Sequence, residues 1–279
     1  MAGPIVVGVD GSESANAAAE WAAADALRRR LPLKVVHVCE RRPGGIEGRK
    51  YCLGVLEAAA DSARAVSGDV EVSTELAEEN VVDFLIGQSA SADSLVLGSR
   101  GSGGFAGLVL GSVGLAVAGH AEGPVVIVRG PAAAEHGQIV VGDDGSESAQ
   151  AAMTYAVEQA RARHARLLAI HAWQAPLVSA YAPDYGLLLE DAFQEEARAA
   201  RERMTRWRTE NPDVEITEQH VREHPVPALG EASATADLVV VGSRGLGAFA
   251  SAVLGSVSHG VLHRAACPVA VVRPRARKP

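Results

Sequence analysis

The sequence has few aromatic residues and no long apolar run, and both shortages limit what the chain can be. Phe, Trp and Tyr make up 4% of the 279 residues, while hydrophobic residues reach 48%, so we expect cores built from Val, Leu and Ala. Short Val-rich runs between Ala-rich stretches favour buried parallel strands covered by helices. No apolar run approaches the ~18–20 residues that a membrane span needs, and the start of the chain lacks a signal-peptide pattern, so we expect no membrane segment.

Positive charge and cysteine are also scarce. The net charge is −8, without a basic face large enough to predict nucleic-acid binding. One cluster of basic residues lies near the end of the sequence, where we expect a short disordered tail: Arg273, Arg275, Arg277 and Lys278. The three cysteines, Cys39, Cys52 and Cys267, form no C-x-x-C motif, which favours a reducing, cytoplasmic location. We therefore interpret Cys39 as a small buried apolar residue.

The chain contains an internal duplication. The run Gly8 to Ser12 (GVDGS) recurs as Gly142 to Ser146 (GDDGS), an offset of 134, and the later motifs recur at an offset of 144. The ten extra residues of the second half fall between its second and fourth strands, where we place the loop 174–186 and a longer helix. At 279 residues, the chain has the length of about two domains.

Two glycine-rich segments are the most informative stretches. Residues 98–112 (GSRGSGGFAGLVLGS) and 242–256 (GSRGLGAFASAVLGS) share the pattern G-x2-G-x9-G-S, and each follows an apolar run and precedes a helical pattern. Glycine lets backbone N–H groups approach an anion closely, and a helix N-terminus favours negative charge. Both segments therefore predict a phosphate-binding loop.

Three common phosphate or hydrolase motifs do not fit these loops. No Lys follows a candidate glycine pair, which excludes a Walker A loop. Residues 101–106 imitate G-x-G-x-x-G/A, but they follow the fourth strand of their unit, and a dinucleotide fingerprint follows the first. Neither loop contains the G-x-S-x-G nucleophile elbow of serine hydrolases.

Strand and helix patterns alternate along each half. In the first half we expect strands at 4–9, 33–38, 70–76, 94–98 and 124–129, and helices at 13–29, 50–66, 80–91 and 113–121. This order predicts a doubly wound parallel α/β sheet, in which ligands bind at the carboxyl ends of the strands. If the first and fourth strands are neighbours, Asp10 and the glycine loop face each other across one crevice.

The motifs V-G-V-D-G-S and G-x2-G-x9-G-S together resemble those of the universal stress protein family, in particular its tandem ATP-binding members. The resemblance covers essentially the whole chain. It implies two α/β/α domains, at 1–130 and 137–279 with a linker at about 131–136, each with a five-stranded sheet of order 3-2-1-4-5. It also implies ATP at the carboxyl ends of strands one and four, with Mg²⁺ as a cofactor.

The same resemblance implies a residue set for each nucleotide site. Val38 and Ala172 would contact adenine through their backbone, and Asp10 and Asp144 would lie at the ribose or near a Mg²⁺ ion. The hydroxyls of Ser112 and Ser256 would reach phosphate oxygens. The full first set is Val9, Asp10, Gly11, Val38, Gly98, Arg100, Gly101, Gly111, Ser112 and Val113. The full second set is Asp143, Asp144, Gly145, Ala172, Gly242, Arg244, Gly245, Gly255, Ser256 and Val257.

Several of these residues have more than one interpretation. Arg100 and Arg244 could clamp phosphates or lie in solvent. Asp143, which stands where the first half has Val9, would repel a polyphosphate unless it points away or helps to hold Mg²⁺; alternation along a strand favours pointing away. We interpret His37 and His171 as packed or hydrogen-bonded core groups, and the tryptophans as packing residues.

The expected function is a nucleotide-dependent regulator of the stress response that binds one ATP per domain. The rival is a slow ATP-hydrolysing or phosphoryl-transferring enzyme, and a third candidate is a module that holds nucleotide structurally to stabilise a dimer. The resemblance implies that the fifth strands, 124–129 and 268–273, pair so that the halves form a pseudo-dimer. We also expect a homodimer and a signalling partner that the sequence does not identify.

Overall fold

The structure, a computed structural model, describes residues 3–39, 45–101, 110–129, 135–173, 186–246 and 254–275. It contains two compact units, residues 1–134 with 267–279, and residues 135–266. Several features expected from the sequence lie outside the described residues: Gly103, Gly104 and Gly107, the middle of the second glycine-rich segment at 247–253, the linker residues 131–134, and most of the loop 174–186. None of the helices in the described ranges is long and apolar enough to cross a membrane.

Strands and helices alternate in unit 1, as the sequence predicts. The elements are β1 (Ile5–Gly8), α1 (Glu13–Arg29), β2 (Leu33–Val38), α2 (Gly45–Ser67), β3 (Val72–Ala77), α3 (Val81–Ser89), β4 (Ser94–Gly98), α4 (Ser112–His120), β5 (Val125–Val128) and the later strand β10 (Val269–Val272). The helix expected at 50–66 begins five residues earlier, at Gly45.

The sheet of unit 1 has the order β3-β2-β1-β4-β5-β10. Its first five strands are parallel and have the order 3-2-1-4-5, with Val7 opposite both Val35 of β2 and Val96 of β4. The pairing of the two fifth strands is also present, because β10 runs antiparallel to β5 with Ala270 opposite Val126. The first and fourth strands are therefore neighbours, which brings their carboxyl ends together.

Unit 2 repeats the pattern with β6 (Gln138–Gly142), α5 (Glu147–Arg163), β7 (Arg166–Ala172), α6 (Gly186–Glu210), β8 (Ile216–Val221), α7 (Pro225–Ala232), a 3₁₀ turn (Ser233–Thr235), β9 (Leu238–Gly242) and α8 (Ser256–Arg264). Its parallel strands have the order β9-β6-β7-β8, which matches strands four, one, two and three of unit 1.

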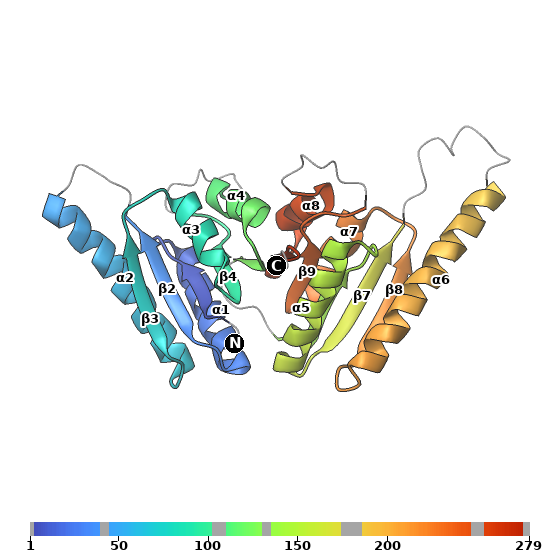
Figure 1. The fold of residues 1–279 in the computed structure, drawn as a ribbon, viewed down its shortest axis with the longest axis horizontal. Helices are drawn as coiled ribbons and strands as arrows, with labels where there is room; N and C mark the ends of the chain where they lie inside the picture. The colour runs from blue at the N-terminus through green and yellow to red at the C-terminus, as the bar shows by residue number, and fades with distance from the viewer. Residues whose placement is uncertain are drawn as a thin grey trace. The chain divides into compact units, whose positions relative to one another are not determined.

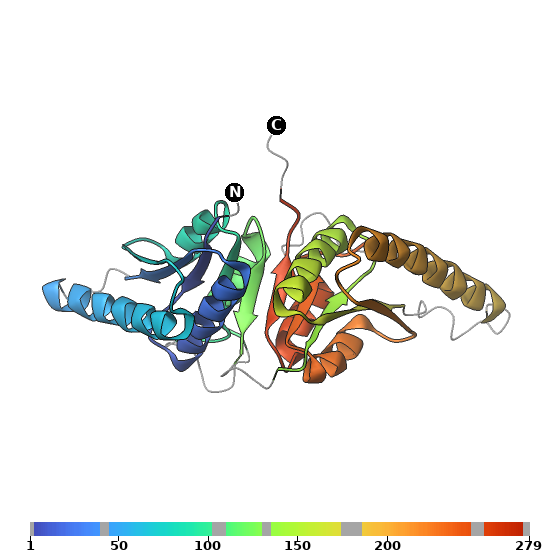
Figure 2. The same cartoon turned by 90° about the horizontal axis from the view of Figure 1, so that it is seen from below.

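Helices cover both faces of the unit 1 sheet. Helices α1 and α2 pack against each other, as Figure 2 shows in dark and light blue, and α3 packs against α4. Figure 1 shows α2 lying along β2 and β3. Alanines at helical spacing form the buried face of α1, including Ala15, Ala18, Ala22 and Ala26. Small side chains let the helix approach the fully buried strand residues Val7 and Val96 closely, so the core is Val- and Ala-rich, as the composition predicts.

Candidate functional site

An aspartate turn follows the first strand of each unit. In unit 1, Asp10 Oδ1 accepts a hydrogen bond from the Ser12 amide at 3.0 Å, and Gly11 has a φ of 82°. In unit 2, Asp144 Oδ1 accepts from the Ser146 amide at 3.0 Å, and Gly145 has a φ of 77°. Only glycine adopts this left-handed conformation without steric cost, so the glycine permits a turn that holds the carboxylate at the strand end.

The aspartate turn meets the start of the glycine loop in both units. A Cβ on Gly101 would lie 2.8 Å from Asp10 Oδ2, and a Cβ on Gly245 would overlap the matching oxygen of Asp144. Asp144 Oδ2 also accepts a hydrogen bond from the Leu246 amide at 3.2 Å. The aspartate turn and the glycine loop, which we expected to face each other across one crevice, are therefore in contact. In the sequence they lie about ninety to one hundred residues apart.

Gly98 and Gly242 allow the first helix to approach the end of the fourth strand. A Cβ on Gly98 would lie 2.7 Å from the carbonyl oxygen of Ser14, and one on Gly242 would lie 2.8 Å from the carbonyl carbon of Ser148. Ser14 Oγ also donates to the carbonyl oxygen of Arg100. The sequence interpretation missed Ser14, although its recurrence as Ser148, within the repeated S-E-S of each half, was a signal that could have found it.

The helices that follow the glycine loops begin differently from the other α-helices whose N-caps are described. Side chains cap α1, α3, α5 and α7: Ser12, Asn80, Ser146 and His224. The N-caps of α4 and α8 are Gly111 and Gly255, and no side chain of the described residues accepts a capping hydrogen bond there. The first amides of each helix, beginning with Ser112 or Ser256, lack an intrahelical acceptor, so these helix starts favour an anion.

Backbone hydrogen bonds fix the position of both helix starts. The Gly111 amide donates to the Ser99 carbonyl at 2.8 Å, and the Gly255 amide donates to the Ser243 carbonyl at the same distance. The loop therefore returns to the fourth strand immediately before the helix begins. Ser112 and Ser256 are exposed, and Val113 and Val257 are half-buried. The hydroxyls and amides at these positions are available to a ligand over the carboxyl edge of the sheet.

The arginines of the two loops differ in exposure. Arg100 is exposed, and Arg244 is half-buried. Their backbone carbonyls accept hydrogen bonds from the first helix, since Ser12 Oγ reaches Arg100 O and Ser146 Oγ reaches Arg244 O, each at 3.5 Å. These contacts hold the backbone of the loop and leave both roles of the guanidinium groups, phosphate clamp or solvated charge, open.

A buried histidine lies within hydrogen-bonding distance of the residue that precedes each turn aspartate. His37 Nδ1 lies 2.6 Å from the Val9 carbonyl oxygen, and His171 Nδ1 lies 2.8 Å from the Asp143 carbonyl oxygen. This confirms the interpretation of both histidines as hydrogen-bonded core groups. Val38 and Ala172, the next residues in the two strands, are half-buried at the carboxyl edge. The backbone ends of strands one and two are thereby tied together beside the site.

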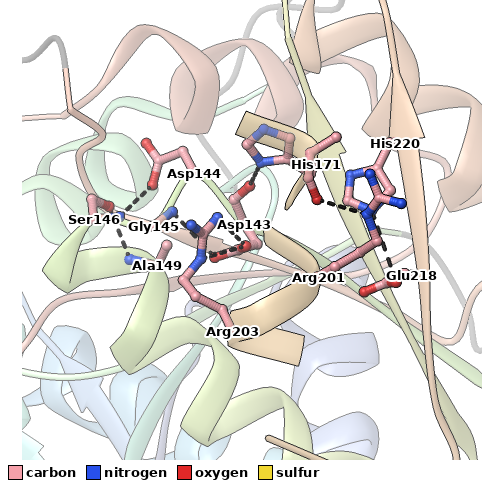
Figure 3. Close-up of polar contacts among 11 residues, drawn as sticks. Asp143, Asp144, Gly145, Ser146, Ala149, His171, Arg201, Arg203, Glu218 and His220 are labelled. Carbon is pink, nitrogen blue, oxygen red and sulfur yellow. Dashed lines mark hydrogen bonds and ion pairs between the residues drawn. The ribbon is translucent and has the colours of Figure 1, made fainter. Parts of the chain in front are cut away.

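Unit 2 carries an ion pair at this point. Asp143 is 7% exposed, and Arg203 of α6 donates to its Oδ2 through Nη2 at 2.8 Å and Nε at 3.2 Å (Figure 3). The guanidinium carbon of Arg203 also lies 3.1 Å from the position of a Cβ on Gly145. The Asp143 carboxylate therefore points toward α6, and Arg203 forms part of the wall beside the aspartate turn. Sequence analysis did not find Arg203.

A second polar cluster, formed by His171, His220 and Glu218, lies near the Asp143–Arg203 ion pair. His171 and His220 stand opposite each other on β7 and β8, with ring centroids 5.8 Å apart, and His220 Nε2 lies 3.9 Å from Glu218 (Figure 3). Burial lowers the pKa of His220, and the positive charges of Arg201 and Arg203 and the nearby His171 lower it further, while Glu218 opposes the shift. His220 therefore favours its neutral form in the folded chain.

In unit 1 the corresponding wall is uncharged and covalently linked to the sheet. The side chain of Val55 lies 3.3 Å from the position of a Cβ on Gly11, and Tyr51 Oη lies 4.0 Å from it. Cys39 forms a disulfide with Cys52 of α2, with 5.9 Å between the Cα atoms. The interpretation of Cys39 as a small apolar residue was therefore wrong: the fold brings two cysteines, thirteen positions apart in the sequence, within bonding reach.

The side chains in the described ranges do not by themselves form a complete metal site. Among the described residues, no group of three His, Cys, Asp or Glu side chains could hold a metal ion. Asp10 and Asp144 each offer a single carboxylate at the edge of the site. One carboxylate fits the way Mg²⁺ binds to nucleotide-binding proteins, in which phosphate oxygens and water complete the coordination shell.

Comparisons with known proteins agree on one family. The profile of the universal stress protein family matches twice, at residues 1–129 and 136–273. A universal stress protein of Mycolicibacterium smegmatis is 34% identical over 97% of both chains, and one of Mycobacterium tuberculosis is 35% identical over 96% of both. A crystal structure of a universal stress protein from Archaeoglobus fulgidus, 22% identical, aligns with a TM-score of 0.69 over 99% of this chain and 98% of its own.

Proposed function

Because the chain belongs to the universal stress protein family, whose profile matches both of its halves, we propose that it is a nucleotide-dependent regulator that binds one ATP at the glycine loop of each unit. The observation that carries the proposal is the combination of an uncapped helix start with an aspartate turn in contact with the glycine loop, built twice. Polyphosphate would bind at the amides of Ser112 and Ser256.

The remaining site residues complete this proposal. Adenine would bind at the ends of β2 and β7, beside the half-buried Val38 and Ala172. Mg²⁺ would bind between phosphate oxygens and the carboxylate of Asp10 or Asp144, and it would neutralise part of the phosphate charge. The ion pair with Arg203 supports binding in unit 2, since it compensates the charge of Asp143. Regulation would operate in the cytoplasm through a partner protein or a homodimer.

Calorimetric titration of the full chain with ATP and Mg²⁺ tests the proposal. We expect binding at two sites. Gly101→Val should remove the first, because the new side chain displaces the Asp10 carboxylate, and Gly245→Val should remove the second through Asp144. Gly54→Ala is the matched control, since a Cβ at Gly54 meets nothing within 4 Å. Unchanged ATP affinity in the double variant would overturn the site assignment, and absence of binding by the unaltered chain would overturn the function.

The same preparation separates a regulator from an enzyme. Steady-state release of phosphate from ATP should be far below the ~1–10³ s⁻¹ range of typical enzymes. Turnover within that range, lost in the Gly101→Val and Gly245→Val variants, would identify a hydrolase instead. Parallel titrations with AMP and cyclic AMP establish how much of the affinity depends on the β- and γ-phosphates.

A further inference from the structure

The Cys39–Cys52 disulfide joins the sheet to the helix that forms the wall of the first site. Cys39 follows β2 directly, and its amide donates to the Ala77 carbonyl at 2.8 Å, so this end of the bond is fixed in the sheet. Cys52 is buried and lies in the second turn of α2. The bond thus connects the carboxyl edge of the sheet with the first half of α2.

Among the described residues, this end of α2 has little buried surface, and an exposed ion pair between Arg49 and Glu78 also links it to the end of β3. In the first turns of the helix, Ile46 and Tyr51 are 78% and 68% exposed, and Cys52 is the first buried residue of those described in the helix. Regular burial begins only with Leu56, Ala59 and Ala60. A helix end with little buried surface opens at low free-energy cost, so a covalent bond at Cys52 has a large effect on its position.

The residues beside Cys52 contact the aspartate turn. Tyr51 precedes it and Val55 lies one turn later, and both approach the position of a Cβ on Gly11 within 4.0 Å. Displacement of this part of α2 would therefore remove one wall of the first site. Holding the wall in place before a ligand arrives lowers the ordering cost of binding.

Unit 2 makes the equivalent connection without cysteine. Trp173 follows β7 at the position that matches Cys39, and its ring packs against Phe193 of α6 with 5.6 Å between centroids. Residues 137–266 contain no cysteine at all. The connection between strand end and helix is therefore sensitive to oxidation and reduction in unit 1, where it is a disulfide, and insensitive in unit 2, where it is an aromatic contact.

From this contrast we propose that Cys39 and Cys52 are a reversible thiol–disulfide site that sets the affinity of the first nucleotide site and leaves the second unaffected. The inference rests on the proposed nucleotide binding. The co-reactant is a low-molecular-weight disulfide, RSSR. One cysteine thiolate attacks it and releases one RSH; the second cysteine displaces the other RSH from the mixed disulfide. The two protein thiols give up two electrons and two protons, and RSSR becomes two RSH.

Calorimetry on the full chain with one site disabled tests this inference. Gly245→Val leaves the first site to be measured, and Gly101→Val leaves the second. Each variant is titrated with ATP and Mg²⁺ after equilibration with glutathione disulfide or with a phosphine reductant, and alkylation followed by mass spectrometry counts the thiols. In Gly245→Val we expect ATP to bind about fivefold or more tightly in the oxidised state, the lower end of usual couplings between sites. In Gly101→Val we expect no difference.

Two cysteine variants complete the experiment. Cys39→Ser with Cys52→Ser, in the Gly245→Val background, should bind ATP with the weaker affinity under both conditions. Cys267→Ser, which replaces the buried thiol outside the disulfide, should keep the full response. Equal affinity of the oxidised and reduced first site would overturn the inference and leave the proposed function intact. Lack of ATP binding in every state would overturn both.

Discussion

The guanidinium of Arg203 pairs with the carboxylate of Asp143 at 2.8 Å, immediately before the aspartate turn of unit 2. In unit 1 the matching position is Val9, and Val55 is the helix residue closest to the position of a Cβ on the turn glycine, Gly11. Duplicated halves thus use an ion pair in one copy and an apolar contact in the other. Because the two arrangements occupy the same place in the fold, the residue types of one unit can be substituted into the other to test the contact.

Removing the cation should destabilise unit 2. Arg203→Met leaves a nearly buried carboxylate unpaired, and we expect a loss of about 2–3 kcal/mol in the free energy of unfolding, below the ~3–5 kcal/mol of fully buried pairs because Arg203 is 26% exposed. The double change Asp143→Val with Arg203→Val copies unit 1 and should recover most of this loss. Urea denaturation measures both. Equal stability of Arg203→Met and the unaltered chain would show that the Asp143–Arg203 pair does not contribute to the free energy of unfolding.

Proline at the start of α4 should weaken ATP binding without unfolding the helix. Ser112→Pro deletes the first helical N–H, a position where proline is tolerated, and Gly111 already has the extended conformation that precedes proline, with φ −76° and ψ 153°. Loss of one charge-assisted hydrogen bond should weaken ATP binding at the first site about 10- to 100-fold.

A comparison of variants and ligands shows whether the lost amide is the cause of the weaker ATP binding. Ser112→Ala removes only the hydroxyl, so the difference between the alanine and proline variants reports the amide. Adenosine should bind both variants equally, because it carries no phosphate. The matching test in unit 2 is Ser256→Pro, since Gly255 has φ −69° and ψ 153°. Equal weakening of ATP and adenosine would contradict a phosphate role for the helix start.

A methyl group at Gly98 should be destabilising for steric reasons. Its Cβ would lie 2.7 Å from backbone atoms of Ser14, which cannot move away as a side chain can. We expect Gly98→Ala to lower the free energy of unfolding by about 1–3 kcal/mol. Gly54→Ala, in an open position of α2, should instead be stabilising by about 0.5–1 kcal/mol. Thermal denaturation of the two variants side by side gives the sign of each effect.

His220 should make the stability of the chain depend on pH. Its pKa in the folded chain is lowered below the ordinary value of 6.5, chiefly by burial. Between the folded pKa and 6.5 the unfolded chain binds a proton that the folded chain does not, so stability falls as the pH drops through this window, by at most about 1.4 kcal/mol per pH unit.

The matched variant for this effect is His220→Leu, because Leu76 holds the same register position in unit 1, opposite His37. Urea denaturation between pH 7.5 and pH 5 should show a smaller loss of stability in the variant than in the unaltered chain. Identical pH profiles would mean that His220 keeps its ordinary pKa in the folded state.

The repeated motifs predicted the α/β fold, the tandem organisation and the position of Asp10 opposite the glycine loop, because periodicity and strand order determine where strand ends meet. They did not predict Arg203, which lies sixty positions from Asp143 and has no counterpart in the first half. The Cys39–Cys52 bond was missed because three cysteines in the sequence do not reveal which pair lies close in space. Gly98 was expected to form part of the phosphate-binding loop, but its steric contact with Ser14 emerges only from the packing of α1 on β4.

The pairing of β5 with β10 has a consequence for how the protein is made. Val128 and Val269 are separated by 141 positions, so the ribosome must synthesise all of unit 2 before the strand that covers β5 exists. Until then β5 has an unpaired apolar edge, the kind of surface that invites aggregation. Expression of the first half alone would leave this edge open permanently. The first half of the chain is therefore completed only by a strand from the second half.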